Sequence, residues 1–494
     1  MMHTMNWLVV YPEIWLLLLA CAVTLVDPFV RDPSRSPTFW LCQLGVGVFT
    51  LMHLQLVRAG VTSYGLHNMV VADPMGHLLA AFAGLATMVT LAYARPTLAA
   101  RDMARGEFYT LALFSLLGIS VMTSANHFLV VYLGLELMSL SLYALVALRR
   151  DHPVATEAAM KYFVLGALAS GFLLYGLSML YGATGSLEIP TVFEKIAAGQ
   201  INRDVLVFGV VFVVAGLAFK LGAAPFHMWV PDVYQGAPTA VTLLIGAAPK
   251  LAAFAITIRL LVEGLLGLAP DWQAMLVVLA VASLVVGNIA AIAQSNLKRM
   301  LAYSTIAQTG FILLGLAAGV VSGNTLSAGN AYSSAMFYIV TYVLTTLGTF
   351  GLIMYLSQQG FESEEITDLA GLGQRAPWLA GVMAVFMFSL AGLPPMVGFF
   401  AKLAVLQALV STSVTGYIWL AVFAVLMSLI GAYYYLRVVK VMYFDAPQQP
   451  ALEPRGAGVS ALLALNGAAV LLLGPLSGGL LALCRDAIVK ALAS

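Results

Sequence analysis

The sequence predicts an all-α integral membrane protein with about fourteen transmembrane helices. Hydrophobic residues make up 61% of the 494 residues and charged residues only 9%, whereas a soluble domain carries roughly 25% charged residues. Apolar runs of about twenty residues, long enough to cross a bilayer, recur from end to end with short polar gaps between them. These observations predict one polytopic membrane domain over residues 1–494.

The apolar runs place the expected helices along the chain. They lie near 11–30, 38–57, 72–93, 107–124, 127–148, 159–181, 204–223, 239–262, 273–293, 300–320, 333–356, 378–410, 415–443 and 457–483. The first run has no basic segment or cleavage site before it, so we expect it to be retained. In the connection at 184–203, Val192, Phe193 and Ile196 share one helical side, which predicts either a short interfacial helix or a plain loop.

The lysines and arginines between the runs predict the orientation of the chain. Most of them fall in odd-numbered loops, among them Arg101, Arg149, Arg150 and Lys298, and few fall in or beside even-numbered loops. Short cytoplasmic loops carry the excess of positive charge. We therefore expect the odd loops in the cytoplasm and both termini on the periplasmic side.

Several classes of function are excluded by composition and motifs. The net charge of +1, without an interleaved basic and aromatic patch, argues against nucleic acid as a partner. No P-loop and no dinucleotide fingerprint in a strand–helix setting occurs. The three cysteines lack the spacing of a disulfide framework, an iron–sulfur cluster or a zinc site, so we expect no metal; they are Cys21, Cys42 and Cys484.

Four ionisable side chains inside the apolar runs are the candidate functional residues. They are Glu136, Lys220, Lys250 and Lys402. A charge in the middle of a bilayer costs roughly 2.5–3.5 kcal/mol on insertion scales, so such residues commonly mark a pathway for protons or small cations. One glutamate cannot neutralise three lysines, and burial favours the neutral amine. We therefore expect some of the lysines to act as switchable proton sites.

Glu136 belongs to a polar stripe. In the segment VYLGLELMSLSLY, Tyr132, Ser139 and Tyr143 share its helical face. The stripe is expected to face protein or water and not lipid. It is either part of a proton site or a hydrogen-bonding contact that holds two helices together.

Glycines and prolines surround the three lysines. Each lysine has a glycine one turn before it, which leaves room for the ammonium, for water or for a neighbouring helix; these are Gly216, Gly246 and Gly398. Pro249 directly precedes Lys250, and Pro394–Pro395 come shortly before Lys402. Broken helices at mid-membrane are typical of transporters, and the matching positions of AGLAFKLG at 215–222 and AGLPPMVG at 391–398 suggest a duplicated unit.

The central segments resemble a known family. FKLGAAPFHMWVPDVYQGAPTAV at 219–241, with Pro249–Lys250 and SLAGLPPMVGFFAK at 389–402, is similar to the antiporter-like membrane subunits of respiratory complex I, the bacterial NADH–quinone oxidoreductase. The variant VPDVYQGAPTAV, and a chain too short after residue 483 for a long lateral helix, favour one of the paralogous subunit types over the others.

The resemblance implies a fold and a set of site residues. It implies two inverted five-helix repeats with broken helices, at 106–262 and 271–443, after N-terminal helices at 1–105 and before a C-terminal helix at 457–494. Glu136 and Lys220 would form a switchable pair, and Lys250 and Lys402 would relay protons along a central axis. His227, in FHMW, would lie between the lysines of helices seven and eight, although a lone histidine at a helix end is equally an interfacial residue.

The resemblance also implies the setting in which the chain works. Protons would cross the bacterial inner membrane here, while NADH oxidation with FMN and iron–sulfur clusters, and quinone reduction, take place in partner subunits. No redox site or cofactor is then expected in this chain, whose partners are the lipid bilayer and the other membrane and peripheral subunits. A subunit of a multi-subunit cation–proton antiporter would share the buried lysines, and VPDVYQGAP argues against it. A purely structural membrane scaffold would need no lysines in the middle of the membrane.

One acidic stretch stands outside the apolar runs. Glu362, Glu364, Glu365 and Asp368 fall in a predicted cytoplasmic loop. We expect a solvated loop, with docking of a partner as the alternative.

Overall fold

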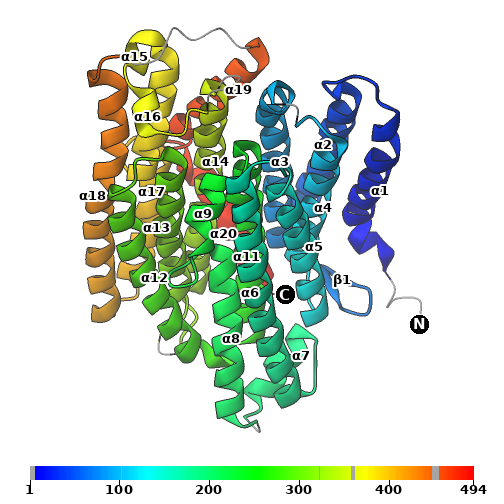
Figure 1. Ribbon diagram of the computed structural model, residues 1–494. Helices are drawn as coiled ribbons and strands as arrows, with labels where there is room; N and C mark the ends of the chain where they lie inside the picture. The colour runs from blue at the N-terminus through cyan, green and yellow to red at the C-terminus, as the bar shows by residue number, and fades with distance from the viewer. Residues whose placement is uncertain are drawn as a thin grey trace.

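The computed structural model describes residues 6–101, 103–199, 201–321, 323–357, 362–447 and 456–493. Over these residues the chain forms a bundle of helices that run roughly parallel or antiparallel to one another, with α1 at one edge and α18 at the other (Figure 1). The all-α membrane class is confirmed. In a bilayer a helix satisfies its own backbone hydrogen bonds, which is why apolar runs of this length take this form.

The first half of the chain contains eight helices and a small hairpin. The α-helices are α1 (Tyr11–Val26), α2 (Ser36–Ala59), α3 (Pro74–Ala100), α4 (Gly106–Thr123), α5 (Phe128–Val146), α6 (Pro153–Thr184), α7 (Ile189–Ala197) and α8 (Arg203–Leu221). Two short 3-10 turns, η1 (Trp7–Val10) and η2 (Asp27–Phe29), flank α1, and the strands are β1 (Ser63–Gly65) and β2 (Val70–Ala72). The strands pair antiparallel, with Ser63 opposite Ala72. The segment at 184–203 does form a short helix, α7, whose Ile189, Val192 and Ile196 are buried.

The seventh and eighth spans are interrupted, and they supply the centre of the molecule. Helix α8 ends at Leu221, and after a turn the chain continues as α9 (Trp229–Gly236). The eighth span consists of α10 (Thr239–Gly246), α11 (Ala248–Thr257) and the wider turn η3 (Ile258–Gly264). Its kink lies at Ala247, two residues before Pro249, and proline lacks the backbone donor that an unbroken helix would need.

The second half repeats this pattern of long helices around one broken helix. It contains η4 (Leu266–Leu268), α12 (Ala269–Ile292), α13 (Leu297–Ala317), α14 (Ala328–Leu356), η5 (Ile366–Leu369), α15 (Leu372–Arg375), α16 (Pro377–Ala391), α17 (Val397–Ser411) and α18 (Thr415–Phe444). Helices α13 and α14 are almost wholly buried, whereas α18 exposes large apolar side chains such as Trp419 and Leu429. Such a surface suits contact with lipid.

Two expected spans differ in detail from single helices. The span expected at 378–410 is the pair α16 and α17, which confirms the break expected at Pro394–Pro395. The span expected at 457–483 is two helices, α19 (Ala457–Leu472) and α20 (Ser477–Leu492), which meet at 83°. Pro475 follows Gly474 at this bend, and proline cannot continue a helix. In the part of the chain that the structure describes, twelve helical segments are long and apolar enough to span a membrane, or thirteen if the bent pair α19 and α20 counts as one span, and α16 and α17 are shorter apolar helices.

The loops lie alternately on two faces of the bundle, as an up-and-down chain requires. Side chains from odd loops gather around one cavity and side chains from even loops around another. Both described chain ends lie on the even-loop face, since η1 packs against the β-hairpin and Arg485 and Val489 of α20 line the even-loop cavity. In Figure 1 this face, with α7, β1 and the N-terminus, is the lower one.

Candidate functional site

Lys220 of α8 binds the serine of the polar stripe on α5, the helix that also carries Glu136. The Lys220 ammonium donates to Ser139 Oγ at 2.8 Å. No ion pair within 4.0 Å joins the side chains of Glu136 and Lys220 among the residues described. One carboxylate oxygen of Glu136 is buried without a hydrogen-bond partner among them. The stripe thus faces protein, as expected, through a hydroxyl and not through direct contact of the charges.

Lys250 binds the carbonyl end of the first broken helix. It is 3% exposed, and its Nζ donates to the carbonyl oxygen of Leu221, the last residue of α8, at 2.7 Å. The ring of Trp229 lies 5.7 Å from the same ammonium. The free backbone donor of the break, Ala224 N, is satisfied by Ser283 Oγ at 2.8 Å.

Lys402 binds the carbonyl end of the second broken helix. The lysine is 8% exposed, and its Nζ donates to the carbonyl oxygens of Leu390 and Ala391 at 3.0 and 2.9 Å. A third bond goes to Ser428 Oγ of α18 at 2.8 Å. The ring of Phe311 lies 5.2 Å from the ammonium.

The two lysine sites are equivalent in structure. Leu221 and Ala391 are each the last residue before a glycine in the left-handed region, Gly222 with φ of 75° and Gly392 with φ of 86°. The last carbonyls of a helix have no partner within it and carry its partial negative charge. Each broken helix therefore supplies acceptors for an ammonium where no carboxylate is needed.

The duplicated unit has a different register from the one expected from the sequence. The matching of 215–222 with 391–398 pairs Gly222 with Gly398, whereas the helix ends pair Gly222 with Gly392. In the structural register a proline also follows each glycine by three residues, as Pro225 and Pro395. Four identical residues are too few to determine which positions of the two broken helices correspond.

The glycines one turn before the lysines make room for neighbouring protein. A Cβ on Gly216 would lie 2.7 Å from Leu173 Cβ, and one on Gly398 would lie 2.0 Å from the carbonyl oxygen of Ser389. One on Gly246 would lie 3.1 Å from the Tyr234 hydroxyl. At all three glycines the space is taken by a neighbouring part of the protein, and not by the lysine ammonium. The ammonium groups of Lys250 and Lys402 are instead bordered by Gly222 and Gly392, where an added Cβ would lie 3.2 Å from Nζ in each case.

Helix α13 joins the two broken ends through adjacent residues. Thr309 Oγ1 donates at 3.0 Å to the carbonyl oxygen of Leu221 that Lys250 also binds. Gln308 Nε2 donates at 3.0 Å to the carbonyl oxygen of Leu390 that Lys402 also binds. Through these two adjacent residues, α13 thus binds a carbonyl oxygen at each lysine site.

Two tyrosines complete this link around Gln308. Its amide nitrogen also donates to the Tyr435 hydroxyl at 2.9 Å, and its amide oxygen accepts from the Tyr338 hydroxyl. Sequence reasoning missed these residues because uncharged polar groups in an apolar run carry little cost. The cluster STIAQTG at 304–310 was the available signal.

His227 lies in the turn between α8 and α9 and is half-buried. No hydrogen bond joins its ring to Lys220 or Lys250 in the described part of the chain, and its Nδ1 is buried there without a partner. His227 lies in the break of the span that carries Lys220, whereas Lys250 lies in the next span, and the ring does not bridge the two lysines directly.

An arginine cluster near the even-loop face was also missed. Arg259 is 1% exposed and binds both oxygens of Asp73 at 2.8 Å, and Glu263 at 2.8 Å. Bidentate pairing of this kind compensates the burial of the charges. Arg259 lies in the last turn of the span expected at 239–262, beside an even-numbered loop, and its position in the sequence does not indicate its burial.

Two histidines form a further buried pair in the N-terminal helices. His53 of α2 and His77 of α3 approach to 3.1 Å between their Nδ1 atoms. At that distance one ring must donate and the other accept, so the two Nδ1 atoms share a single proton.

The acidic stretch is not the solvated loop that was expected. Glu362 forms ion pairs with Arg101 and Arg149, each at 3.1 Å, and Glu364 forms one with Lys298 at 2.6 Å. Lys298 is 1% exposed. The basic residues of three odd loops therefore hold the acidic segment against the bundle. Among the side chains that the structure describes, no group of three or more histidines, cysteines, aspartates or glutamates is arranged to hold a metal ion.

Comparison with known proteins places the chain in a family. Residues 125–431 match the family NADH:quinone oxidoreductase/Mrp antiporter, TM. NADH-quinone oxidoreductase subunit N of Polaromonas naphthalenivorans (strain CJ2) is 63% identical over 491 residues, which cover 99% of this chain and 98% of that protein. A chain of respiratory complex I from Thermus thermophilus with bound aureothin matches with a TM-score of 0.80 at 32% identity, covering 96% of this chain and 99% of that one. A chain of the Mrp complex from Dietzia sp. DQ12-45-1b has the same fold, with a TM-score of 0.84 at 20% identity over 98% of this chain and 97% of that one. This chain is a member of the family of NADH-quinone oxidoreductase subunit N.

Proposed function

We propose that this chain is the proton-translocating membrane subunit of a bacterial NADH–quinone oxidoreductase. Protons cross the inner membrane through it while partner subunits transfer electrons from NADH to quinone. The subunit N relatives and the complex I chain support this function. The observation that carries it is the binding of Lys250 and Lys402 to equivalent carbonyl ends of two broken helices.

The chemistry of these two sites suits a proton carrier. A carbonyl oxygen accepts a hydrogen bond from an ammonium and from a neutral amine alike. Neither lysine has a carboxylate partner among the described residues, so a proton can leave without exposing a buried anion. Moving one proton against 100 mV costs roughly 2.3 kcal/mol, which is comparable to the roughly 1.5–3 kcal/mol of one hydrogen bond to a charged group.

We assign one role to each candidate residue. Glu136 and Lys220 form the switchable pair, coupled through Ser139. Lys250 and Lys402 are the relay sites along the centre of the bundle. His227 transfers protons between Lys220 and Lys250, and its unpartnered Nδ1 supports this role.

The proposal includes the repeats, the orientation and the partners. Residues 106–262 and 271–443 act as two inverted five-helix repeats, each with one helix broken before a glycine, and 1–105 and 457–494 flank them. Odd loops face the cytoplasm and both termini face the periplasm, as the distribution of lysine and arginine indicates. FMN, the iron–sulfur clusters and quinone are bound by partner subunits.

The test is to replace the relay lysines in the intact complex. In Lys250→Met and Lys402→Met we expect complexes that assemble on a native gel but pump protons at least about tenfold more slowly, as for loss of a proton-transfer group. Lys440→Met is the matched control, because Lys440 is exposed and pairs only with Asp445 in the described structure. Normal pumping in both relay variants would refute the function proposed for these sites.

A sodium test separates this function from the antiporter alternative. For a proton carrier, pumping is expected to be the same in media whose only alkali cation is sodium or potassium. A requirement for sodium would favour a cation–proton antiporter.

A further inference from the structure

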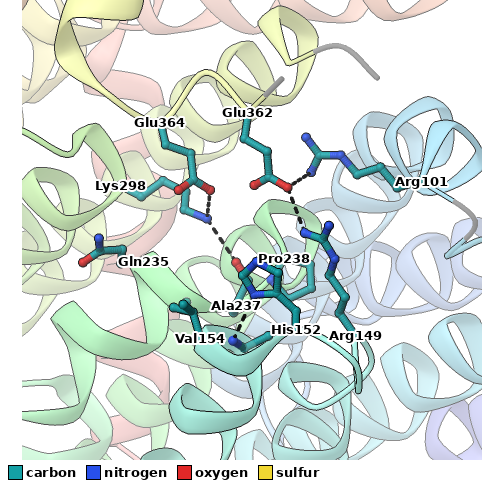
Figure 2. A pocket seen from close by; sticks show the side chains of 12 residues that line it. Arg101, Arg149, His152, Val154, Gln235, Ala237, Pro238, Lys298, Glu362 and Glu364 are labelled. Atoms are coloured by element: carbon teal, nitrogen blue, oxygen red, sulfur yellow. Dashed lines mark hydrogen bonds and ion pairs between the residues drawn. The ribbon is translucent and has the colours of Figure 1, made fainter. Parts of the chain in front are cut away.

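A charged cavity opens on the odd-loop face, where five loops meet. Its volume is about 440 Å³, and its wall comes from the segments before α4, between α5 and α6, between α9 and α10, at the start of α13 and before η5. Figure 2 shows Glu362 and Glu364 over one side of it, with Lys298 beside Glu364, Arg101 and Arg149 beside Glu362, and Ala237 and Pro238 near the centre. The proposed function assigns no role to this cavity.

The charges in the cavity are held in fixed positions. Glu362 bridges Arg101 and Arg149 at 3.1 Å each. Glu364 binds Lys298 at 2.6 Å, and Lys298 Nζ also donates to the carbonyl oxygen of Ala237 at 3.1 Å. The side chain of Lys298 is 1% exposed, whereas that of Glu364 is 22% exposed. Glu364 thus reaches solvent on one side and a buried cation on the other.

The two carboxyl groups have different affinities for protons. Burial, reinforced by the negative charge of Glu362, raises the pKa of Glu364 despite the nearby Lys298 ammonium. Burial acts the same way on Glu362, but a hydrogen bond from Glu364 and the charges of Arg101, Lys298 and Arg149 outweigh it and lower its pKa. Two adjacent carboxyl groups of this kind hold one proton between them. The charged or titratable groups that face Glu364 are Arg101, Arg149, His152, Lys298 and Glu362.

A polar stripe on α13 leads from this cavity to the central site. Lys298 lies at the cavity, Thr305 two turns further, and Thr309 one turn beyond that, so the three share one helical face. Thr305 Oγ1 is 2.7 Å from the Tyr342 hydroxyl, and Thr309 donates to the Leu221 carbonyl oxygen that also binds Lys250. Eleven residues of helix span roughly 16 Å, about half of the hydrocarbon thickness of a membrane.

We propose that the cavity formed by Glu362, Glu364 and Lys298 is the site where the subunit takes up protons from the cytoplasm, and that the stripe on α13 delivers them to Lys250. This inference rests on the proposed function. The Glu364 carboxyl gives its proton inward toward the stripe and is reprotonated by a hydronium ion or a buffer acid, while the Lys298 ammonium stays charged and holds Glu364 at the start of the stripe. Glu362 stays ionised and keeps the shared proton on Glu364.

The first experiment replaces the proton-holding carboxyl in the whole complex. Initial rates of NADH-driven proton uptake are measured in inside-out membrane vesicles carrying Glu364→Gln, Glu364→Asp or the control Glu107→Gln, which removes an exposed acid on the same face. In Glu364→Gln the rate is expected to fall increasingly as the pH rises, by about fivefold or more at alkaline pH, because uptake then depends on direct encounter with scarce hydronium ions. Glu364→Asp is expected to restore most of the rate. A pH profile of Glu364→Gln identical to that of Glu107→Gln would overturn the proposal.

The second experiment blocks the cavity without changing its charges, and it remains informative if Glu364→Gln fails to assemble. Val154 is exposed and lines the cavity, so a bulky maleimide on Val154→Cys would obstruct it. Val26→Cys, at an exposed position at the end of α1 on the same face, is the control, and labelled wild type accounts for the natural cysteines. Labelled Val154→Cys is expected to pump several-fold more slowly than before labelling. Unchanged pumping at full labelling would refute the site.

The outcomes separate this inference from the function on which it rests. If Lys250→Met abolishes pumping while both cavity variants pump normally, the uptake site is wrong and the relay stands. If Lys250→Met pumps normally, the relay itself fails, whatever the cavity variants do.

Discussion

Among the residues that the structure describes, Lys250 and Lys402 are stabilised by backbone carbonyls and not by carboxylates. Lys250 and Lys402 each bind the last carbonyls of a helix that stops before a glycine. A carboxylate partner would favour the charged form strongly, whereas a neutral acceptor leaves both protonation states accessible. In the relay that we propose, this choice of partner is what allows the two side chains to gain and lose protons.

The ionisable residues were predictable from the sequence, but their partners were not. Glu136, Lys220, Lys250 and Lys402 stand out because a charge is costly in an apolar run. Gln308 and Thr309 do not, since an uncharged polar side chain in such a run also occurs as a simple helix contact. The burial of Lys298 was hidden because a lysine at a helix start is most often a loop residue.

The Arg259 cluster yields a stability prediction. Replacing Arg259 by methionine leaves Asp73 buried without its partner, and breaking a buried pair in this way costs about 3–5 kcal/mol. We expect Arg259→Met to lower the thermal stability of the assembled complex strongly, as measured by loss of the native-gel band on heating. Adding Asp73→Asn removes the unpaired charge and keeps an oxygen that caps α3. The double variant should therefore be more stable than Arg259→Met alone; the opposite order would contradict this account.

At the level of helices, the breaks were predictable and their alignment was not. Prolines before Lys250 and Lys402 indicated interrupted spans, and the structure has them. The correspondence between the two broken helices depends on where each first half ends, which is set by the left-handed glycines Gly222 and Gly392. A short sequence match cannot report a backbone conformation. The bend between α19 and α20 was likewise missed, although Gly474 and Pro475 mark it.

The left-handed glycine of the second broken helix gives a prediction with a control of opposite sign. Gly392→Ala places a Cβ 2.8 Å from Lys402 Cδ at a φ of 86°, where an L-residue costs roughly 1–2 kcal/mol. We expect lower thermal stability and slower proton pumping, because Lys402 must move. Gly416→Ala, inside α18 with no atom within 4 Å of the added Cβ, should be neutral or stabilising by up to about 1 kcal/mol. Equal behaviour of the two variants in thermal inactivation assays would argue against a role for the helix end.

For the whole molecule, the sequence predicted the alternation of loops between two faces but not what each face builds. Hydropathy and charge suffice to assign loops to sides. They cannot show that three odd loops and the acidic segment close around one cavity, because each contact joins residues far apart in the chain. Glu362, for example, lies 213 residues from the Arg149 that it binds.

The orientation can be measured with one cysteine on each face. Leu326 is 91% exposed on an even loop, and Arg150 is exposed on an odd loop. In right-side-out vesicles a membrane-impermeant maleimide is expected to label Leu326→Cys and not Arg150→Cys. Inside-out vesicles should give the reverse. The opposite labelling pattern would invert the proposed orientation and would move the uptake cavity to the periplasm.

The attachment of α13 to both broken helices has a mechanical consequence. Thr309 and Gln308 are neighbours in sequence and point about 100° apart around the helix, so each binds one broken helix end to a different side of α13. Any rotation of α13 about its axis strains both hydrogen bonds at once. The two lysine sites are therefore mechanically coupled. A displacement of one carbonyl end rotates α13 and so displaces the other end, without any charge moving between the two sites.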